Sequence, residues 1–299
     1  MVDPTLKWAG GKRHFQSRIG AHIPEEFNCY YEPFLGGGAI AFGLELSPAM
    51  LSDINPRLIN YYKQVRDNTT ELLAYLDGFR DPAAEPDESH QFTDTSHFGH
   101  DIDSYYYQAR ARFNKRPYGY DYDPVAEAAL LQYLNRTCFN GLYRENQSGG
   151  FNTPIGDYDN PDWVQEERVR ELSAYLNIGG VHLFEMDYKH GALIGDGDVV
   201  YADPPYQPLS SSADFTEYSA EGFDATDQRQ LLTALSHWAN KGATVIASNS
   251  GVMADQYESA GFDVYTAEAP RSINSDATNR DAVDEIIAVR NGAEQTARS

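Results

Sequence analysis

The chain has 299 residues, of which 41% are hydrophobic, and a formal net charge of −22. This length suits one large α/β domain or a core domain with an insertion, and the composition excludes a disordered chain. No apolar run approaches the ~18 residues of a membrane span, and the N-terminus lacks the apolar core of a secretory signal. The only cysteines, Cys29 and Cys138, lie far apart, so we expect no disulfide framework and a cytoplasmic localisation.

The acidic excess, 45 Asp and Glu against 23 Lys and Arg, is spread along the chain rather than gathered in a tail. It has two interpretations: an ordinary acidic cytosolic protein, or a halophilic protein whose multimolar salt shortens the Debye length to about 3 Å or less. We favour the halophilic interpretation, because salt at that concentration screens the repulsion among the acidic side chains. Taken alone, the charge argues against a nucleic-acid partner.

In chain order, residues 30–34 predict a short strand, a Gly-rich turn opens a helix, and residues 49–53 predict a second strand that ends on Asp53. Apolar spacing predicts helical structure over 58–76. The next expected elements are a polar loop rich in Pro and His, two helices and a polar, Gly-rich stretch: 81–100, 103–116, 125–137 and 140–156.

After residue 160, strands and helices alternate. The predicted strands are 181–187, 199–203, 243–249, 262–269 and 284–289, and the predicted helices are 169–176, 226–242 and 251–261. The longest of these helices has Thr226 as its predicted N-cap. The alternation predicts an α/β fold with a mostly parallel sheet covered on both faces. The helical middle of the chain interrupts this rhythm and has the character of an inserted subdomain.

Glycines between the first strand and its helix form a G-x-G-x-x-A spacing, Gly36 to Ala41. Glycine lets the backbone turn tightly and approach a ligand at a helix N-terminus, and Asp53 would accept from ribose hydroxyls. Two other interpretations of this spacing are a dinucleotide-binding fold and a tight structural turn without a ligand.

The N-terminal stretch LKWAGGKR places Trp8 and Lys12 on either side of two glycines. Its spacing does not match a phosphate-binding P-loop. Two interpretations remain: a basic surface loop, or an aromatic wall with a nearby cation that suits a purine ring and a carboxylate.

The apolar run VVYA ends in Asp203-Pro204-Pro205-Tyr206. One interpretation is a turn that merely ends the strand, because two prolines force an extended exit. The other is chemical. The Asp203 carboxylate and the Pro204 carbonyl would be two fixed acceptors at the ligand-binding edge of a parallel sheet, which suits an amino group on a heteroaromatic ring, and Tyr206 would supply a face for that ring.

The chain resembles the Dam-type, or D12 class, adenine-N6 DNA methyltransferases in an ordered series of motifs. These are LKWAGGKR, YYEPFLGGGA, LSDIN, LNRTCFNGLYREN–GGFNTPIG and VVYADPPYQPLS, followed by SADFTEYSAEGF and RSIN…VDEIIA. The resemblance covers nearly the whole chain. It implies a Rossmann-like S-adenosylmethionine-dependent methyltransferase sheet, with a catalytic domain at 1–56 and 160–299 and an inserted helical target-recognition domain at 57–159.

The resemblance also implies roles for single residues. Asp203, Pro204 and Tyr206 match the family's catalytic motif. The residues that match its S-adenosylmethionine-binding motifs are Trp8, Lys12, Phe34, Gly36, Asp53 and Asp203. The expected reaction is transfer of a methyl group from S-adenosylmethionine to N6 of adenine in a short duplex DNA sequence, after the target base has been flipped out.

The residues that match the family's DNA-contacting loop are Phe139, Asn140, Leu142, Arg144 and Pro154. Phe139 would wedge or stack at the flipped site, and Arg144 would contact phosphate or a guanine edge; local packing is the alternative for Phe139 and Leu142. Members that methylate GATC carry a guanine-reading arginine where this chain has Asp157, so GATC is only a default.

Duplex DNA is the expected partner, with a cognate restriction endonuclease as a second candidate, no membrane partner and a monomeric enzyme. The positive residues expected near DNA or cofactor are Lys7, Lys12, Arg13, Arg18, Arg110, Arg112, Lys115, Arg116, Arg136, Arg144, Arg271 and Arg280. No spacing indicates a metal site, because His90, His97 and His100 share one polar loop, where solvated side chains are expected.

Three alternatives stay open. The same chemistry on cytosine N4, RNA or a protein amide is compatible with the Asp-Pro-Pro-Tyr motif. An NAD-binding oxidoreductase fits the glycines and Asp53 but leaves Asp-Pro-Pro-Tyr and LKWAGGKR unexplained. An inactive DNA-binding relic would bind the cofactor without transferring a methyl group.

Overall fold

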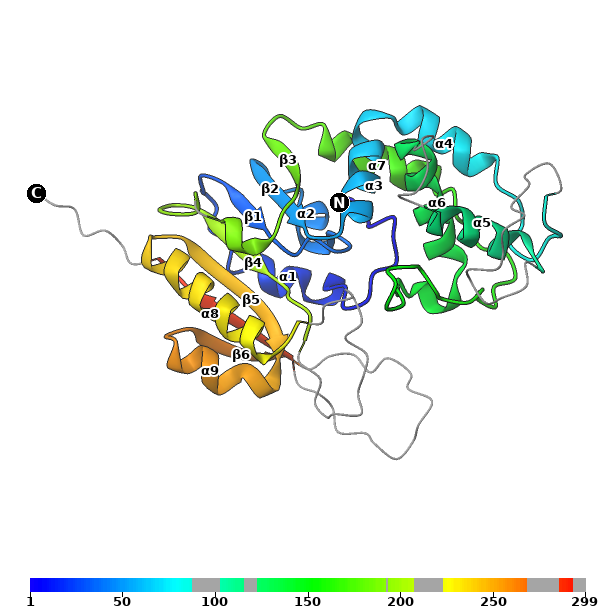
Figure 1. Cartoon of the computed structure of the whole chain (residues 1–299). Helices are drawn as coiled ribbons and strands as arrows, with labels where there is room; N and C mark the ends of the chain where they lie inside the picture. Colours follow the sequence, from blue (N-terminus) through cyan, green and yellow to red (C-terminus); the bar gives the residue numbers. More distant parts are fainter. Residues whose placement is uncertain (88–102, 116–122, 192, 207–222, 268–284, 293–299) are drawn as a thin grey trace, which may run out of the picture.

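The computed structural model describes residues 1–87, 103–115, 123–191, 193–206, 223–267 and 285–292. A seven-stranded sheet in the order β3-β2-β1-β4-β5-β7-β6 forms its centre (Figure 1). The strands are β1 Tyr30–Glu32, β2 Ala49–Asp53, β3 Val181–Glu185, β4 Val199–Ala202, β5 Thr244–Ser250, β6 Asp263–Ala267 and β7 Glu285–Arg290. The pairs from β3 to β5 are parallel, whereas β7 is antiparallel to both β5 and β6. The predicted α/β fold with a mostly parallel sheet is confirmed.

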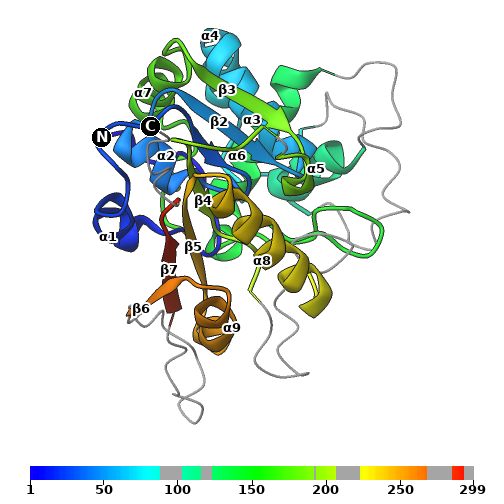
Figure 2. The same ribbon diagram turned by 90° about the vertical axis from the view of Figure 1, so that its left-hand side faces the viewer.

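Helices cover both faces of this sheet, as expected for a parallel sheet buried on both sides. Figure 2 shows α1 and α2 on one side of β4 and α8 on the other. The helices are α1 Gln16–Gly20, α2 Ala39–Leu44, α3 Pro56–Asp67, α4 Thr69–Asp77, α5 Tyr105–Asn114, α6 Pro124–Thr137, α7 Glu166–Leu176, α8 Ala225–Asn240 and α9 Ala254–Ser259.

The strand pleat divides the buried side chains between two hydrophobic clusters. On β4, Val199 and Tyr201 join the cluster under α2, while Val200 and Ala202 join the cluster under α8. Because successive side chains of a strand point to opposite faces, a continuous apolar run is what a strand buried on both faces requires. This explains why β4 could be predicted from its composition alone.

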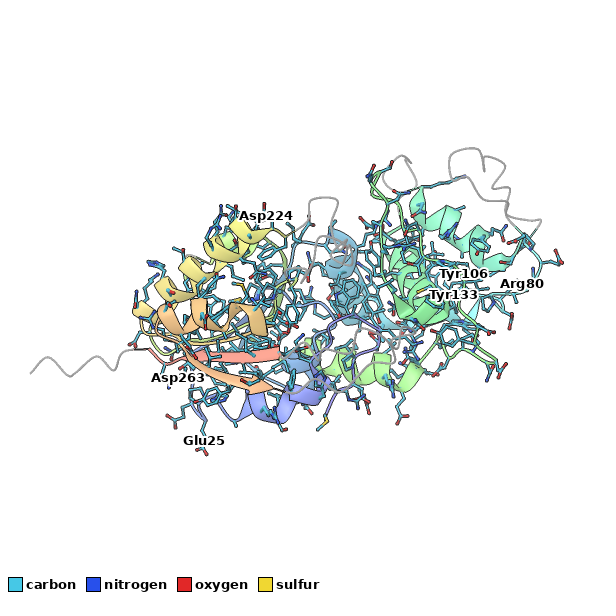
Figure 3. All side chains as sticks on the ribbon, turned by 90° about the horizontal axis from the view of Figure 1, so that it is seen from below. Glu25, Arg80, Tyr106, Tyr133, Asp224 and Asp263 are labelled. Carbon is cyan, nitrogen blue, oxygen red and sulfur yellow. The ribbon has the colours of Figure 1, made fainter. Side chains whose placement is uncertain are left out.

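The helical middle of the chain gathers beside the β3 edge of the sheet (Figure 1). Helix α3 packs on α6 and α7 and also contacts β3 and β2. Figure 3 labels Tyr106 and Tyr133 among these helices, and both side chains are fully buried. The cluster under α2 continues into these helices, so the helical region shares its packing with the sheet. The division at residues 57–159 stays a prediction.

Two details of the predicted elements differ from the structure. The helical segment expected at 58–76 is two helices, α3 and α4, which meet at Asn68. The predicted N-cap Thr226 was wrong. Helix α8 begins at Ala225, and the Asp224 carboxylate accepts from the backbone N–H groups of Thr226 and Asp227, in a reciprocal capping box with Asp227.

Most of the predicted loop at 81–100, most of SADFTEYSAEGF and the stretch between β6 and β7 lie outside the described residues. So do His90, His97 and His100, and the arginines at 116, 271 and 280.

Candidate active site

The site candidates follow the strands at the edge where the parallel strands end. Asp203 comes directly after β4, whose four residues are fully buried, and Asp53 closes β2. Strands β1 and β4 are neighbours in the sheet, and the chain order reverses between them. Such a reversal is where ligands bind in open α/β sheets.

Lys12 brings the predicted catalytic residues together. Its ammonium donates to the Gly10 carbonyl at 2.7 Å and lies 3.1 Å from Asp203 Oδ1. The same ammonium lies 4.6 Å from the centre of the Tyr206 ring. Only 3% of Lys12 is exposed, so it is a buried cation stabilised by a carboxylate, a carbonyl and an aromatic face.

Burial raises the pKa of Asp203 to about 6, against the opposing effect of Lys12. The carboxyl is therefore ionised at neutral pH. Its Oδ1 atom is buried and makes no hydrogen bond of good geometry within the described residues. An ionised oxygen with unused acceptor capacity is able to accept from an incoming amino group.

A buried chain of amides supports the Asp-Pro-Pro-Tyr turn from below. Gln228 on α8 donates to the Pro205 carbonyl at 2.8 Å, and Asn249 on β5 donates to the Gln228 side chain at 3.0 Å. Asn249 in turn accepts from the Ser250 backbone at 2.8 Å. Both amides are almost completely buried. The turn is therefore fixed by two elements that lie far from it in sequence.

The Gly-rich turn after β1 packs against Trp8. Gly36 has φ +48°, and a Cβ there would lie 2.9 Å from the Trp8 ring, so a side chain is excluded by both conformation and contact. The Gly36 N–H donates to Asp53 Oδ2 at 2.9 Å, and its carbonyl accepts from Tyr62 at 2.7 Å. Contacts with Trp8, Asp53 and Tyr62 thus fix the conformation of the turn.

Asp53 also accepts from the Asn55 backbone, at 2.9 Å from Oδ1. Each of its oxygens keeps a further lone pair. The neighbouring Ile54 is 63% exposed, which leaves an apolar surface beside the carboxylate. Phe34 lies near Tyr188 and Phe223, with ring centres 5.4 Å and 6.0 Å away. The predicted cofactor residues Trp8, Gly36 and Asp53 are therefore in direct or adjacent contact.

The predicted DNA-contacting residues lie on a hairpin-like segment after α6. Phe139 donates its backbone N–H to the Pro154 carbonyl at 2.9 Å, and its side chain is 53% exposed. Arg144 donates from Nε to Asn152 Oδ1 at 2.7 Å. Asn140 and Pro154 are exposed and Leu142 is half-buried. The Phe139 side chain is thus not packed into the core, and its contact with DNA stays a prediction.

Asn135 joins this segment to the N-terminal loop. Its amide accepts from the Lys7 N–H and donates to the Lys7 carbonyl, both at 2.7 Å, and donates to the Gly141 carbonyl at 3.0 Å. Gly141 has φ +67°, and a Cβ there would lie 2.4 Å from the Lys7 side chain. Trp8 stacks on Tyr143 with ring centres 5.3 Å apart. The two predicted binding regions are therefore structurally connected.

Three residues of this region were missed from the sequence. Gln228 and Asn249 lie in predicted elements but carry no signal of their contact with the turn. Glu285 begins β7, and its Oε2 accepts from Tyr206 Oη at 3.1 Å. It belongs to the VDEIIA motif, and a carboxylate at the first residue of an apolar strand was the available signal.

The described residues contain neither a metal-binding cluster nor a membrane-spanning helix. Among the described residues, no cluster of three or more His, Cys, Asp or Glu side chains could hold a metal ion. Within the same ranges, no helix is long and apolar enough to cross a membrane.

Comparison with known proteins places this geometry in a family. The model of the D12 class N6 adenine-specific DNA methyltransferase family matches residues 8–273. The chain belongs to this family. The matched range contains Lys12, Asp203 and Tyr206, so the buried cluster at the strand ends is part of an adenine-specific DNA methyltransferase.

Similar proteins cover the chain almost completely. The type II methyltransferase M1.LlaDCHI of Lactococcus lactis subsp. cremoris is 35% identical over 97% of this chain and 96% of its own length. The type II methyltransferase M.MjaIII of Methanocaldococcus jannaschii is 34% identical, with 96% and 98% covered. The DNA adenine methylase of Escherichia coli K12 is 32% identical, with 95% and 94% covered. The similarity to these methyltransferases therefore extends over nearly the whole chain.

Proposed function

We propose that this DNA methyltransferase transfers a methyl group from S-adenosylmethionine to N6 of adenine in a short duplex DNA sequence, after the base has been flipped out. The observation that carries the proposal is the buried Asp203 carboxylate, whose unused acceptor capacity lies beside Lys12 and Tyr206 at the end of β4. GATC remains the default target sequence.

The residues at the strand ends suit S-adenosylmethionine. The Gly-rich turn exposes backbone close to Trp8, Asp53 has lone pairs left for ribose hydroxyls, and Ile54 offers an exposed apolar surface for a purine. The residues that would hold the cofactor are Trp8, Lys12, Phe34, Gly36, Asp53 and Asp203. When bound, the cofactor supplies a methyl group already activated by a positive sulfur.

The chain's own part in the reaction is positioning and charge complementarity. Adenine N6 is a poor nucleophile because its lone pair is conjugated with the ring. Asp203 and the Pro204 carbonyl would each accept a hydrogen bond from one N6–H, which favours a tetrahedral nitrogen and frees its lone pair. The nitrogen would form its bond to the methyl group as the bond from that methyl to sulfur breaks, and the positively charged product would then lose one N6 proton to Asp203 or water. Lys12 stabilises the ionised Asp203 that this step needs.

An amino group inside a duplex is out of reach, so the base has to leave the stack. Lys12 covers one face of the Tyr206 ring, and the base would stack on the other. Such stacking contributes about 1–3 kcal/mol per base.

DNA recognition falls to the helical region at 57–159 in this proposal. The exposed Phe139 would wedge at the flipped site, and Arg144, held by Asn152, would contact phosphate or a guanine edge. Asn140, Leu142 and Pro154 complete the proposed interface.

Two relatives are named type II methyltransferases, which supports a restriction-modification role. The proposal includes a cognate endonuclease as a partner and a monomeric methyltransferase. Cys29 and Cys138 are free thiols, which supports action in the reducing cytoplasm.

The test is to incubate the protein with methyl-labelled S-adenosylmethionine and duplex DNA in high potassium chloride, and to digest the product to nucleosides. We expect label in N6-methyladenosine, and none with Asp203→Ala. Label in cytosine would overturn the adenine assignment but keep the chemistry. Cofactor binding without label in any base would overturn methyl transfer to DNA.

A further inference from the structure

Glu285 lies at the active-site edge although it begins the last described strand. Strand β7 runs antiparallel to β5, and Glu285 pairs with Ser250 at the end of β5. An antiparallel strand starts where its neighbours finish. The chain thereby brings a carboxylate from its C-terminal part to the end of β4.

The side chain of Glu285 contacts two members of the buried cluster through one oxygen. Its Oε2 accepts from Tyr206 Oη at 3.1 Å and lies 3.7 Å from Lys12 Nζ. The Glu285 side chain is 17% exposed. Glu285 therefore contacts both the hydroxyl of the aromatic ring and the buried ammonium.

A second carboxylate is not needed to neutralise Lys12. Asp203 already lies 3.1 Å from the ammonium, and two ionised carboxylates around one lysine leave a net negative charge, which is costly to bury. A charge that is unfavourable for stability, as that of Glu285 beside Asp203 is, indicates a functional contact. The contact that Glu285 makes beyond Lys12 is with the Tyr206 hydroxyl, which donates to it at 3.1 Å.

We infer that Glu285 is a positioning residue for methyl transfer: it fixes the Tyr206 ring and the Lys12 ammonium, so that ring and Asp203 carboxylate meet the target base together. This inference rests on the proposed function. Glu285 acts through Tyr206 and Lys12 and need not touch the base.

The charge of Glu285 also acts on Asp203, whose pKa it raises while Lys12 lowers it. The other titratable groups with electrostatic effects on or from Asp203 are Tyr206, Tyr201, Glu32 and Tyr257. Removing the charge of Glu285 alone should let Asp203 ionise at lower pH. This shift reports the contact of the Glu285 charge with Asp203, and the loss of the acceptor for Tyr206 is tested separately.

The experiment compares Glu285→Gln, Glu285→Ala and the wild type in steady-state methylation of duplex DNA across pH. Glutamine keeps an acceptor for Tyr206 but not the charge, so we expect kcat within about threefold of wild type at pH 8. We also expect the acidic limb, the low-pH side of the rate profile, to be displaced to lower pH. Alanine removes the acceptor as well, so kcat should fall by about 10- to 100-fold, the range for losing a hydrogen bond to a charged group.

A double-mutant comparison tests the route through Tyr206. The Tyr206→Phe variant already lacks the hydroxyl that donates to Glu285. Adding Glu285→Ala to it should therefore lower kcat by a smaller factor than Glu285→Ala does in the wild type. Glu258→Ala, an equal loss of charge at an exposed position on α9, is the matched control and should leave kcat and the pH profile unchanged.

Two failures are distinguishable. If the wild type methylates adenine while Glu285→Ala keeps wild-type kcat and Glu285→Gln keeps the wild-type acidic limb, the inference is overturned and the proposed function stands. If the wild type methylates no adenine, the proposed function falls, and the inference with it. Should Glu285→Ala not fold, the acidic limb of Glu285→Gln decides.

Discussion

The Asp203 carboxyl sets the pH range in which the enzyme is expected to work. Burial raises its pKa to about 6, and the ionised form is the one whose two oxygens both accept hydrogen bonds from an amino group. We therefore predict that kcat/KM, which reports the free enzyme, falls about tenfold per pH unit below pH 6 and levels off above it. Circular dichroism over the same range serves as the control for unfolding. A flat profile down to pH 5 would contradict this role of Asp203.

Glu32 is a second buried carboxyl, under α2 rather than in the reaction site. Its Oε2 accepts from Tyr30 Oη at 2.7 Å and from the Ala41 N–H at 3.2 Å, and burial raises its pKa to about 8. The folded state therefore keeps this proton at neutral pH, whereas the unfolded chain releases it. Folding then loses free energy as pH rises from the unfolded pKa of 4.5 to about 8, by up to about 1.4 kcal/mol per unit.

Glu32→Gln tests this linkage, because glutamine keeps the shape and the acceptor but does not ionise. We predict that the variant gains stability relative to wild type as pH rises from 5 to 8, measured as the free energy of unfolding in urea. A constant difference between the two proteins at all pH values would show that Glu32 does not titrate in this range.

At the level of single residues, the sequence was most informative where the chemistry is local. Asp203 and Tyr206 are three positions apart in one motif, whereas their contact with Lys12, which was assigned only to cofactor binding, was not predicted. The place of Glu285 beside them could not be predicted either, because it depends on β7 inserting between β5 and β6. Thr226 was wrongly chosen as a cap because Asp224, two residues earlier, offers the same chemistry with a carboxylate.

The elements themselves show a similar contrast. The strands could be predicted because a strand covered on both faces has a continuous apolar run, as in β4. The break between α3 and α4 was missed because apolar spacing continues across Asn68, where the backbone leaves the helical region. The contact between α6 and the N-terminal loop was also hidden, since it depends on one amide meeting the backbone of a distant residue.

The Asn135 side-chain amide supports a prediction about how α6 is joined to the N-terminal loop. Asn135 satisfies the N–H and carbonyl of Lys7 and the carbonyl of Gly141, and it is fully buried. Asn135→Leu would leave these three groups unpaired, so we expect a loss of about 2–4 kcal/mol in the free energy of unfolding, together with weaker DNA binding because Gly141 and Tyr143 lose their support. Urea unfolding and a DNA titration measure both.

Asn160→Ala is the matched control for this change. Asn160 is exposed, and surface substitutions usually stay within about 0.5 kcal/mol. Equal stability of Asn135→Leu and this control would mean that the backbone of the N-terminal loop finds other partners.

At the scale of the whole molecule, the dominant feature is the net charge of −22. Exposed acidic residues occur on distant parts of the surface, for example Glu25, Asp224 and Asp263 (Figure 3). Of the positive residues expected near DNA or cofactor, Lys12 and Arg110 are buried. Among the described residues, these two cations are not free to bind phosphate. With so acidic a surface, base contacts, stacking and shape would carry more of the DNA affinity than counterion release.

This distribution predicts that salt stabilises the fold. Raising potassium chloride from 0.1 M to 2 M shortens the Debye length from about 10 Å to below 3 Å and screens the repulsion among acidic side chains. We expect the melting temperature to rise over this range, measured by differential scanning calorimetry. A melting temperature that is unchanged or lower in 2 M salt would contradict the halophilic interpretation.

The contact between Lys12 and Glu285 also has a consequence for folding during synthesis on the ribosome. The two residues are 273 positions apart (285 − 12), and β7 must enter the sheet between two strands that are already synthesised. At translation rates of about 5–20 residues per second, roughly 15–55 s separate them on the ribosome. A nascent chain therefore lacks the contact between Lys12 and Glu285 until β7 emerges, so we expect a ribosome-bound fragment that ends before β7 to methylate DNA poorly.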